Sequence, residues 1–399
     1  MKYDFTSILD RAGKDAIAVD MIPFPDAQVK EGFDKIPMWV ADMNFPVLPA
    51  IQDRIIERTK HPAFGYYEYT DEYYNSIIGW QERRHGVSGI TKDNIGYQNG
   101  VVGGVVSALM AFTAPGDAVL LHAPAYIGFI RAIENCGRTI VFSHLNRDKD
   151  GIWRMDYEDM AQKIKKHNIH LAIFCSPHNP TGRVWEKEEL ELAMDIYKEN
   201  DCVVVADEIW ADLTLDGYKH IPTQSVSEDA RNRTIALYAP SKTFNIAGLI
   251  GSYHIVYNNC LKHRFEKLSY MNDYNNMNVL SMHALIGAYS EEGDVWVDEL
   301  RSVLTGNVEY AYTFITEHFE DIDLSRPQGT YMLYLDCSKW CEKHGKAVDD
   351  LIRAGIEVGV IWQDGRPFGK DNTIRMNLAL PLSRVKEAFD RLMQYVFVS

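Results

Sequence analysis

The sequence lacks long apolar segments. No apolar run approaches the roughly 20 residues that a membrane-spanning helix needs, and residues 1–7 have none of the apolar character of a secretion signal. We therefore expect a soluble protein of the cytoplasm that does not bind membranes.

Cysteines are few, and their spacing does not suit a metal. None of the six forms a Cys-x-x-Cys pair, and no histidine completes a site with Cys337 and Cys341, which could share a helix face. Unpaired cysteines are typical of a reducing compartment, so we expect free thiols and no bound metal. The cysteines are Cys136, Cys175, Cys202, Cys260, Cys337 and Cys341.

Basic residues are outnumbered by acidic ones. The chain has 41 Lys and Arg against 56 Asp and Glu, a formal net charge of −15. Such a surface repels phosphate backbones, so we expect no nucleic-acid partner. An anionic ligand must then be held locally, by backbone amides and single arginines. At 399 residues, 46% of them hydrophobic, the chain can bury a large core.

Between about residues 90 and 260, short apolar runs alternate with longer helical patterns. This alternation is typical of an α/β fold with a mostly parallel sheet. Several runs are solidly Val, Ile, Leu and Phe, as in strands covered on both faces. The predicted strands are residues 118–122, 139–144, 171–175, 203–207, 235–239 and 253–256, and the predicted helices are residues 156–167 and 186–200.

Beyond about residue 285 the pattern indicates a smaller α+β unit. The first 46 residues contain four prolines, so we expect this segment to be extended and to lie against that unit. The predicted parts are an N-terminal segment (1–48), a large domain (49–288) and a small C-terminal domain (289–399). In the last part we predict helices at residues 294–319, 347–354 and 383–396, and strands at residues 329–336, 358–362 and 373–378.

Lys242 follows a predicted strand, in the segment Thr-Ile-Ala-Leu-Tyr-Ala-Pro-Ser-Lys (234–242). Desolvation at the mouth of a buried sheet lowers the pKa of an amine. A neutral amine can form a Schiff base with an aldehyde. The alternative is an ordinary loop lysine, but that interpretation does not account for the residues expected beside it.

Two further polar residues are expected at the same edge of the sheet, because ligands bind outside the carboxyl ends of the strands. Asp207 ends Val-Val-Val-Ala-Asp (203–207), where a carboxylate can pair with a pyridine nitrogen, a metal or a ribose. Asn179 lies in Ser-Pro-His-Asn-Pro-Thr-Gly (176–182), a tight turn that could also present its amide to a phenolic oxygen. Together with Lys242, these groups describe a pocket for pyridoxal 5'-phosphate (PLP).

Three weaker signals agree with this pocket. A glycine-rich turn before residue 101 enters a helix and supplies amides for a phosphate, although close helix packing explains it equally well. Tyr126 follows a strand and either stacks on the cofactor or packs at the sheet edge. Arg375 lies in an apolar strand, where it meets either a substrate carboxylate or a buried structural partner.

Over essentially its whole length, the chain resembles the fold type I PLP enzymes, the aspartate aminotransferase superfamily. Within it, the chain is most similar to the cystathionine β-lyase-like branch, which includes cystalysin-type C–S lyases. The motifs that carry the resemblance are Pro-Met-Trp-Val-Ala-Asp-Met (37–43), Phe-Gly-Tyr (64–66), the segment 176–182, Ala-Asp-Glu-Ile (206–209) and Ala-Pro-Ser-Lys-Thr-Phe-Asn-Ile-Ala-Gly (239–248).

For the cofactor, the resemblance implies a seven-stranded, mostly parallel sheet with a PLP site at its edge. Lys242 would form the Schiff base, Asp207 would pair with the pyridine nitrogen, and Asn179 would bind the phenolic oxygen. Tyr126 would stack on the ring. The amides of Val101 and Val102, with Ser241, would hold the phosphate, and Trp210 would complete the cofactor site.

For the substrate, the resemblance implies that Arg375 and Trp39 contact the amino acid. Lys242, Tyr66 and Arg375 are the implied catalytic residues. Tyr66 would reach the phosphate of the neighbouring subunit, since members of the family are homodimers with shared active sites.

The chain departs from the family pattern at three positions near these motifs. Trp210 stands where lyases usually have histidine and aminotransferases often have tyrosine, and an indole donates a hydrogen bond but cannot accept one. Asn44 replaces an acidic residue near the substrate entrance, and Ile127 replaces an aromatic residue. These changes bear on the substrate and the reaction rather than on cofactor binding.

The resemblance implies a cystathionine or cysteine-S-conjugate β-lyase that releases a thiol, pyruvate and ammonia. In this hypothesis Arg375 holds the carboxylate, and the freed Lys242 amine removes the Cα proton. Transamination is an alternative, because it uses the same lysine. A second alternative is a PLP-binding regulatory protein that acts by contacting another protein.

Overall fold

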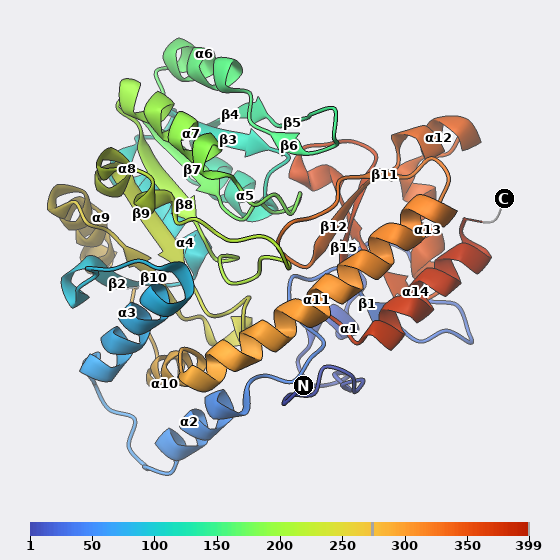
Figure 1. Cartoon of the computed structure of the whole chain (residues 1–399), viewed down its shortest axis with the longest axis horizontal. Helices are drawn as coiled ribbons and strands as arrows, with labels where there is room; N and C mark the ends of the chain where they lie inside the picture. Colours follow the sequence, from blue (N-terminus) through green and yellow to red (C-terminus); the bar gives the residue numbers. More distant parts are fainter. Residues whose placement is uncertain (273–274, 398–399) are drawn as a thin grey trace.

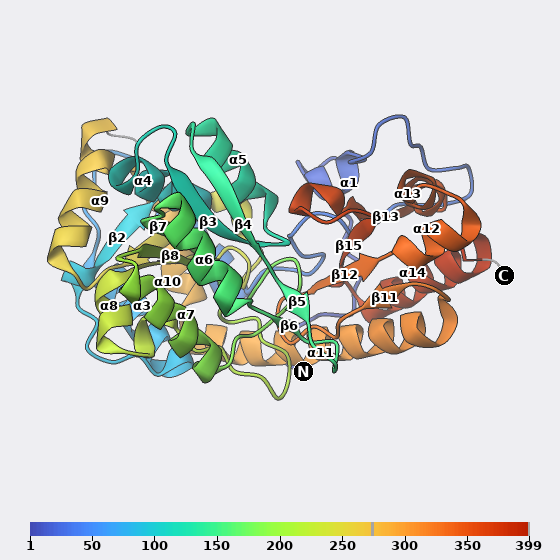
Figure 2. The same cartoon turned by 90° about the horizontal axis from the view of Figure 1, so that it is seen from above.

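The computed structural model describes residues 1–272 and 275–397, so residues 273, 274, 398 and 399 of the predicted domains lie outside the described residues. Two main sheets, of seven and four strands, lie side by side. The long helix α11 (Glu291–His318) runs along both of them (Figures 1 and 2).

The strands alternate with helices through most of the chain. The strands are β1 (Ile36–Pro37), β2 (Ile95–Gln98), β3 (Ala118–Ala123), β4 (Thr139–His144), β5 (Asn146–Arg147), β6 (Trp153–Arg154), β7 (Leu171–Cys175), β8 (Val203–Asp207), β9 (Thr234–Tyr238), β10 (Ser252–Ile255), β11 (Asp323–Leu324), β12 (Met332–Asp336), β13 (Val360–Ile361), β14 (Gln363–Asp364) and β15 (Thr373–Asn377). The other helices are α1 (Ile17–Asp20), α2 (Pro49–Thr59), α3 (Asp71–His85), α4 (Val101–Phe112), α5 (Ile127–Asn135), α6 (Tyr157–His167), α7 (Lys187–Glu199), α8 (Glu228–Arg233), α9 (Asn259–Asn272), α10 (Val279–Ala288), α12 (Ser338–His344), α13 (Val348–Glu357) and α14 (Leu382–Tyr395).

The seven-stranded sheet has the order β2-β10-β9-β8-β7-β3-β4. All neighbours pair in parallel except β10, which is antiparallel to both β2 and β9. Apolar side chains of α4, α5 and α9 pack on one face, and those of α6, α7 and α8 pack on the other. Strands such as β7 are therefore buried at every residue. The predicted α/β fold with a mostly parallel seven-stranded sheet is confirmed.

The four-stranded sheet is antiparallel, in the order β11-β12-β15-β14. Helix α14 packs against α11 beside it. Near this sheet, β1 of the N-terminal segment pairs in parallel with β13, with Ile36 opposite Val360. The first residues of the chain therefore lie beside its last third.

The strands of the large sheet lie close to their predicted positions, because short runs of Val, Ile, Leu and Phe mark them clearly. Some elements differ. The strand expected at residues 329–336 begins only at Met332, and the strand expected at 358–362 is reduced to β13. In the part of the chain that the structure describes, no helix is long and apolar enough to cross a membrane.

Candidate active site

A cavity of about 220 Å³ lies at the carboxyl ends of β8 and β9, beside the start of α4. This is the edge of the sheet at which the sequence predicted a ligand. Eight of the predicted site residues line the cavity: Val101, Val102, Tyr126, Asn179, Asp207, Trp210, Ser241 and Lys242.

The amine of Lys242 lies at the wall of this cavity. Its Nζ donates a hydrogen bond to the carbonyl oxygen of Ala41 at 2.8 Å. Burial lowers the pKa of Lys242 to about 8, and the charge of Arg375 acts in the same direction, while Asp42 and Asp207 oppose them. An amine with this pKa is partly neutral near pH 8 and can attack a carbonyl carbon or accept a proton.

Asp207 lies at the end of β8 and is 4% exposed. Its Oδ1 accepts a hydrogen bond from the backbone N–H of Ile209 at 3.0 Å. Burial raises the pKa of Asp207 to about 7, although this backbone hydrogen bond and Lys242 favour the charged form. A cation bound in the cavity would stabilise this carboxylate, and a protonated pyridine nitrogen is such a cation.

The first turn of α4 supplies hydrogen-bond donors to the cavity. Gly100 precedes it with a φ of +79°, a left-handed conformation that favours glycine. The amides of Val101 and Val102 then begin the helix, where N–H groups have no partner within the helix. With Ser241 on the same wall, these groups suit a phosphate.

Tyr126 precedes α5 and lines the cavity. Its ring packs edge-on against Phe129, with ring centroids 5.3 Å apart. A Cβ at Gly128 would overlap the Tyr126 ring, so the glycine makes room for it. Burial raises the pKa of Tyr126, which keeps its phenol neutral. An aromatic side chain on this wall suits a planar ring in the cavity.

Asn179 is buried, and its amide oxygen accepts a hydrogen bond from Arg375 Nη1 at 3.1 Å. The loop that carries it is tied to the chain before β12. The backbone N–H groups of Gln328 and Gly329 both donate to the carbonyl oxygen of Gly182, at 2.8 and 2.9 Å. The loop thus connects the two sheets.

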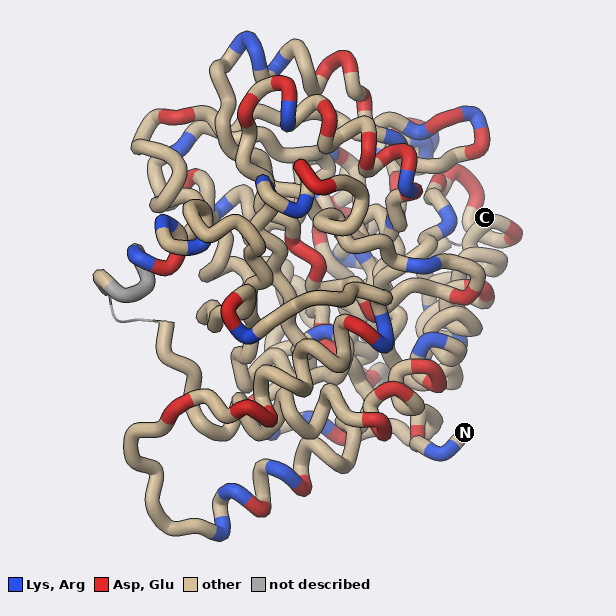
Figure 3. The backbone as a smooth tube through the Cα atoms, turned by 60° about the vertical axis from the view of Figure 1, so that its left-hand side comes forward, with Lys and Arg blue, Asp and Glu red and all other residues tan. Residues whose placement is uncertain are grey.

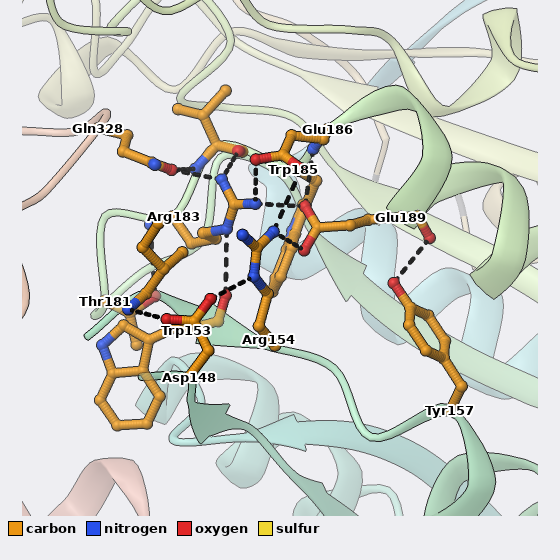
Figure 4. A network of polar contacts seen from close by, with 12 residues as sticks. Asp148, Trp153, Arg154, Tyr157, Thr181, Arg183, Trp185, Glu186, Glu189 and Gln328 are labelled. Carbon is orange, nitrogen blue, oxygen red and sulfur yellow. Dashed lines mark hydrogen bonds and ion pairs between the residues drawn. The ribbon is translucent and has the colours of Figure 1, made fainter. Parts of the chain in front are cut away.

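A network of charged side chains holds this loop from behind (Figure 4). Arg183, which follows the loop, is 3% exposed and donates to Glu189 and, at 3.1 Å, to Glu186. Arg154 donates to Glu189 and to Asp148, both at 2.9 Å. Because a buried charge without partners is costly, this network favours one position of the loop.

Arg375 lies in β15 and is 3% exposed. Its Nη2 donates to the carbonyl oxygen of Trp39 at 3.0 Å and to Oε1 of Gln363. Its Nε has no hydrogen-bond partner, and no carboxylate pairs with the guanidinium among the described residues. Burial lowers the pKa of Arg375 to about 10. A buried guanidinium with only neutral partners favours an anionic ligand over a structural ion pair.

Three of the predicted residues do not line the cavity: Arg375, Trp39 and Tyr66. Arg375 is linked to the cavity by its hydrogen bond to Asn179, which lines it. The indole N–H of Trp39 donates to the carbonyl oxygen of Ala18 at 2.9 Å, so this donor is already used. Tyr66 is fully exposed, in the segment that projects between α2 and α3 (Figures 1 and 3).

Trp210 is 2% exposed and lines the cavity, with Lys242 Nζ 5.9 Å from the indole ring. Asn44, the second departure from the family pattern, is buried. It accepts a hydrogen bond from Arg11 at 2.9 Å and donates to the carbonyl oxygen of Pro37 at 3.3 Å. Its contacts are therefore structural.

Sequence reasoning did not identify Ala41, Ser252 and Asp42 as site residues. The carbonyl of Ala41 binds Lys242, Ser252 lines the cavity, and Asp42 favours the protonated form of Lys242. Ala41 and Asp42 lie in the 37–43 motif, whose position beside Lys242 depends on tertiary contacts. Ser252 begins an antiparallel strand, and nothing in its local sequence distinguishes it.

The model for "Aminotransferase class I and II" matches residues 34–392. The chain belongs to this family. The family relatives include the cystathionine β-lyase PatB of Bacillus subtilis (strain 168), which is 33% identical over 361 residues, 90% of this chain and 92% of PatB.

Solved structures of the family show the same architecture. Cystalysin from Treponema denticola, which contains pyridoxal 5'-phosphate, has a TM-score of 0.89 and 32% identity over 99% of this chain and 98% of cystalysin. The PLP-bound C–S lyase from Staphylococcus hominis has a TM-score of 0.88 and 30% identity over 98% of each chain. The predicted resemblance to fold type I PLP enzymes of the C–S lyase branch is confirmed.

Proposed function

We propose that the protein is a PLP-dependent C–S lyase that cleaves cystathionine or another S-conjugate of cysteine into a thiol, pyruvate and ammonia. The observation that carries the proposal is the Lys242 amine, with its lowered pKa, on the wall of a cavity that also contains the buried carboxylate of Asp207. The whole-chain similarity to PatB, cystalysin and a C–S lyase supports the lyase reaction.

The residues that line the cavity fit PLP. Lys242 would hold the aldehyde carbon, and Asp207 would pair with the pyridine nitrogen, which relieves the cost of its buried charge. Asn179 would bind the phenolic oxygen, Tyr126 would stack on the ring, and the first amides of α4 with Ser241 would hold the phosphate. When bound, the coenzyme supplies an electron sink for the bond electrons at Cα.

The residues of the chain would supply binding and proton transfer. Arg375, whose Nε has no partner, would bind the α-carboxylate of the amino acid. Lys242 would accept the Cα proton at Nζ, because burial lowers its pKa to about 8. The sulfur would leave Cβ as a thiolate, and the released unsaturated amino acid would hydrolyse to pyruvate and ammonia.

We further propose a homodimer in which Tyr66 completes the site of the partner. Tyr66 is fully exposed, and Phe64 beside it is 56% exposed. A hollow of about 640 Å³ lies along the same segment and reaches Met277. Exposed aromatic side chains on a projecting segment suit an interface between subunits. A reducing cytoplasm is the proposed location, since the six cysteines are free thiols.

Transamination is the second candidate, and the family description favours it. The two reactions would differ after the Cα proton is removed: a lyase would expel the Cβ substituent, whereas an aminotransferase would transfer the amino group and would need a keto-acid acceptor. Trp210, which lines the cavity beside Lys242, cannot accept a proton and does not decide between them.

The deciding experiment incubates the PLP-loaded enzyme with L-cystathionine and, separately, with S-ethyl-L-cysteine in the absence of any keto acid. Release of thiol and pyruvate in equal amounts is the result expected for the lyase. Turnover that requires 2-oxoglutarate and releases no thiol would establish the aminotransferase instead. The Lys242→Ala variant is the control for coenzyme chemistry that does not depend on the enzyme's base.

A further inference from the structure

A second cavity, of about 390 Å³, lies apart from the candidate active site. It is lined by the end of α3 and the turn after it, by parts of the segment 222–231 that leads into α8, and by residues of β9 and β10. The two cavities have no described lining residue in common. The volume falls within the usual range for small-molecule sites. A ligand can therefore occupy this cavity without displacing one from the cavity of Lys242.

The wall of the second cavity contains a buried hydrogen-bond acceptor without a partner. Gln81 lines the cavity and is 1% exposed. Its Nε2 donates to the hydroxyl of Tyr253 at 3.0 Å, but its Oε1 makes no hydrogen bond with the residues that the structure describes. Because most buried polar groups are paired, an unpaired acceptor on a cavity wall favours a ligand that brings a donor.

A second amide on this wall also offers an acceptor. Gln224 lines the cavity and is 7% exposed. Its Nε2 donates to the carbonyl oxygens of Thr234 and Ile255, both at 2.9 Å, which uses both amide hydrogens. Its Oε1 accepts no hydrogen bond from the described part of the chain. Two amide oxygens on one cavity suit a ligand group with several N–H donors, such as an ammonium.

Helix α8 brings opposite charges to the same cavity. Glu228 and Arg231 line it and are exposed. Neither forms an ion pair with a described residue, whereas Asp229 and Arg233 of the same helix pair with each other. The guanidinium carbon of Arg231 lies 4.0 Å from the centroid of the Tyr257 ring, a contact that orients the group and leaves its charge available. A ligand with one positive and one negative group matches this pair.

The remainder of the wall is largely apolar. Tyr238 and Ile255 are 3% and 2% exposed. The hydroxyl of Tyr238 already donates to Glu208 at 2.6 Å, so its ring is the part that remains for a ligand. An apolar side chain is removed from water when it packs here. The apolar and aromatic lining residues are Val87, Pro222, Tyr238, Ile255 and Tyr257.

We propose that this cavity is a second binding site, which takes a free α-amino acid with an apolar side chain. The ammonium group donates to the amide oxygens of Gln81 and Gln224, beside the carboxylate of Glu228. The carboxylate of the ligand binds the guanidinium of Arg231, and its side chain packs against the two tyrosine rings. The inference does not depend on the lyase function, because no residue of the active-site cavity takes part.

The test measures the binding of L-leucine by isothermal titration calorimetry. The PLP-loaded protein is first reduced with sodium borohydride, so that the coenzyme cannot react with the added amino acid. Two fragments of leucine are compared with it: 4-methylpentanoate, which lacks the amino group, and 3-methylbutylamine, which lacks the carboxylate. Each fragment is expected to bind about tenfold more weakly than leucine or worse, because each leaves charged or polar partners in the cavity unmatched.

Variants of the cavity locate the binding. Arg231→Met removes the charge, keeps an apolar stem and is expected to weaken leucine binding about tenfold or more. The matched control is Arg264→Met, since Arg264 in α9 is also exposed and lies over an aromatic ring, 4.9 Å from the centroid of Phe112, but does not line the cavity. Gln81→Leu removes the unpaired acceptor and is expected to weaken binding as well. If Gln81→Leu does not fold, the exposed Arg231 position still decides.

Activity is a separate readout. In the unreduced enzyme, Arg231→Met is expected to keep the unmodified kcat with S-ethyl-L-cysteine, because Arg231 does not line the cavity of Lys242. A loss of kcat that accompanies the loss of leucine binding would assign the binding to the active site and overturn the proposal.

Three further results would overturn the second site. They are the absence of saturable leucine binding, equal affinity for leucine and either fragment, and unchanged affinity in Arg231→Met. Failure of the lyase function has a different signature, since an enzyme that releases no thiol from cysteine conjugates is still expected to bind leucine in this cavity.

Discussion

Two walls of the candidate active site are built in different ways. The cofactor wall consists of Val101, Tyr126, Asn179, Asp207 and Lys242, each of which ends or follows a strand of the seven-stranded sheet. Each residue is placed by its own strand or helix end. A strand that ends in the correct register is sufficient to bring its side chain to the cavity.

The substrate wall consists of Arg375, Trp39 and Asp42, which come from β15 and the N-terminal segment and adjoin the residues that line the cavity. Contacts between distant segments place them. Arg375 holds the carbonyl of Trp39, and Asn377 donates to the carbonyls of Val40 and Asp42, both at 2.6 Å. The cofactor wall is therefore determined locally, whereas the substrate wall depends on how remote parts of the chain pack together.

The largest expected effect is on the cofactor wall. Lys242→Ala should lower thiol release by about 10⁴-fold or more, because it removes both the covalent anchor and the base. The measurement is kcat with S-ethyl-L-cysteine. Lys187→Ala is the control, since Lys187 is an exposed lysine of α7 that pairs with Glu191. A variant at position 242 that retains a tenth of the activity would contradict the role of Lys242.

The second-largest expected effect is a loss of stability when the charged network behind the Asn179 loop is broken. Arg183→Met removes the buried partner of Glu189, which then keeps only the partly exposed Arg154, and should lower the free energy of unfolding by up to about 3 kcal/mol. Arg154→Met, at a side chain 32% exposed, should cost about 1 kcal/mol or less. Urea unfolding of both variants measures the difference. Equal losses of unfolding free energy in the two variants would contradict the larger role of Arg183, the buried arginine of the network.

On the substrate wall, Arg375→Lys should raise KM about 10²-fold and change kcat less, since a lysine cannot keep the fork of hydrogen bonds that binds a carboxylate. Steady-state kinetics with S-ethyl-L-cysteine measures both constants. Arg366→Lys is the control, because Arg366 pairs with Asp364 at a partly exposed site. A fall in kcat without a rise in KM would place Arg375 outside the carboxylate site.

The smallest expected effect is a displacement of the pH profile. The base must be neutral, so the rate should rise with pH through the pKa of Lys242, which burial lowers to about 8. Asp42 raises that pKa, so Asp42→Asn should move the rise to lower pH. The profile of kcat against pH tests this, with Asp34→Asn as control, since Asp34 pairs with Arg384 and Arg391. A move to higher pH would contradict the coupling.

The same contrast explains what the sequence could predict. The strands β7 and β8 and the residues that follow them were found because apolar runs and their terminal polar residues are adjacent in sequence. Arg375 was noticed because arginine is unusual in an apolar strand. Lys242, Asp207 and Asn179 lie together at the cavity as expected.

On the substrate wall, the sequence indicated Arg375 and Trp39 but not Asp42. Asp42 lies in the 37–43 motif, and only the structure shows that it pairs with Arg11 and that its charge acts on Lys242. The indole N–H of Trp39 binds a carbonyl of its own segment, a contact that no periodicity indicates. Tyr66 stands apart from the cavity of its own chain, and its predicted role depends on a second subunit.

The most direct measurement of the proposed chemistry is to incubate the protein with pyridoxal phosphate, reduce it with sodium borohydride and map the labelled peptide by mass spectrometry. The expected result is one stable label, on Lys242, with loss of the label when L-cycloserine is added before reduction. A label on another lysine in equal yield, or none on Lys242, would contradict the proposed site.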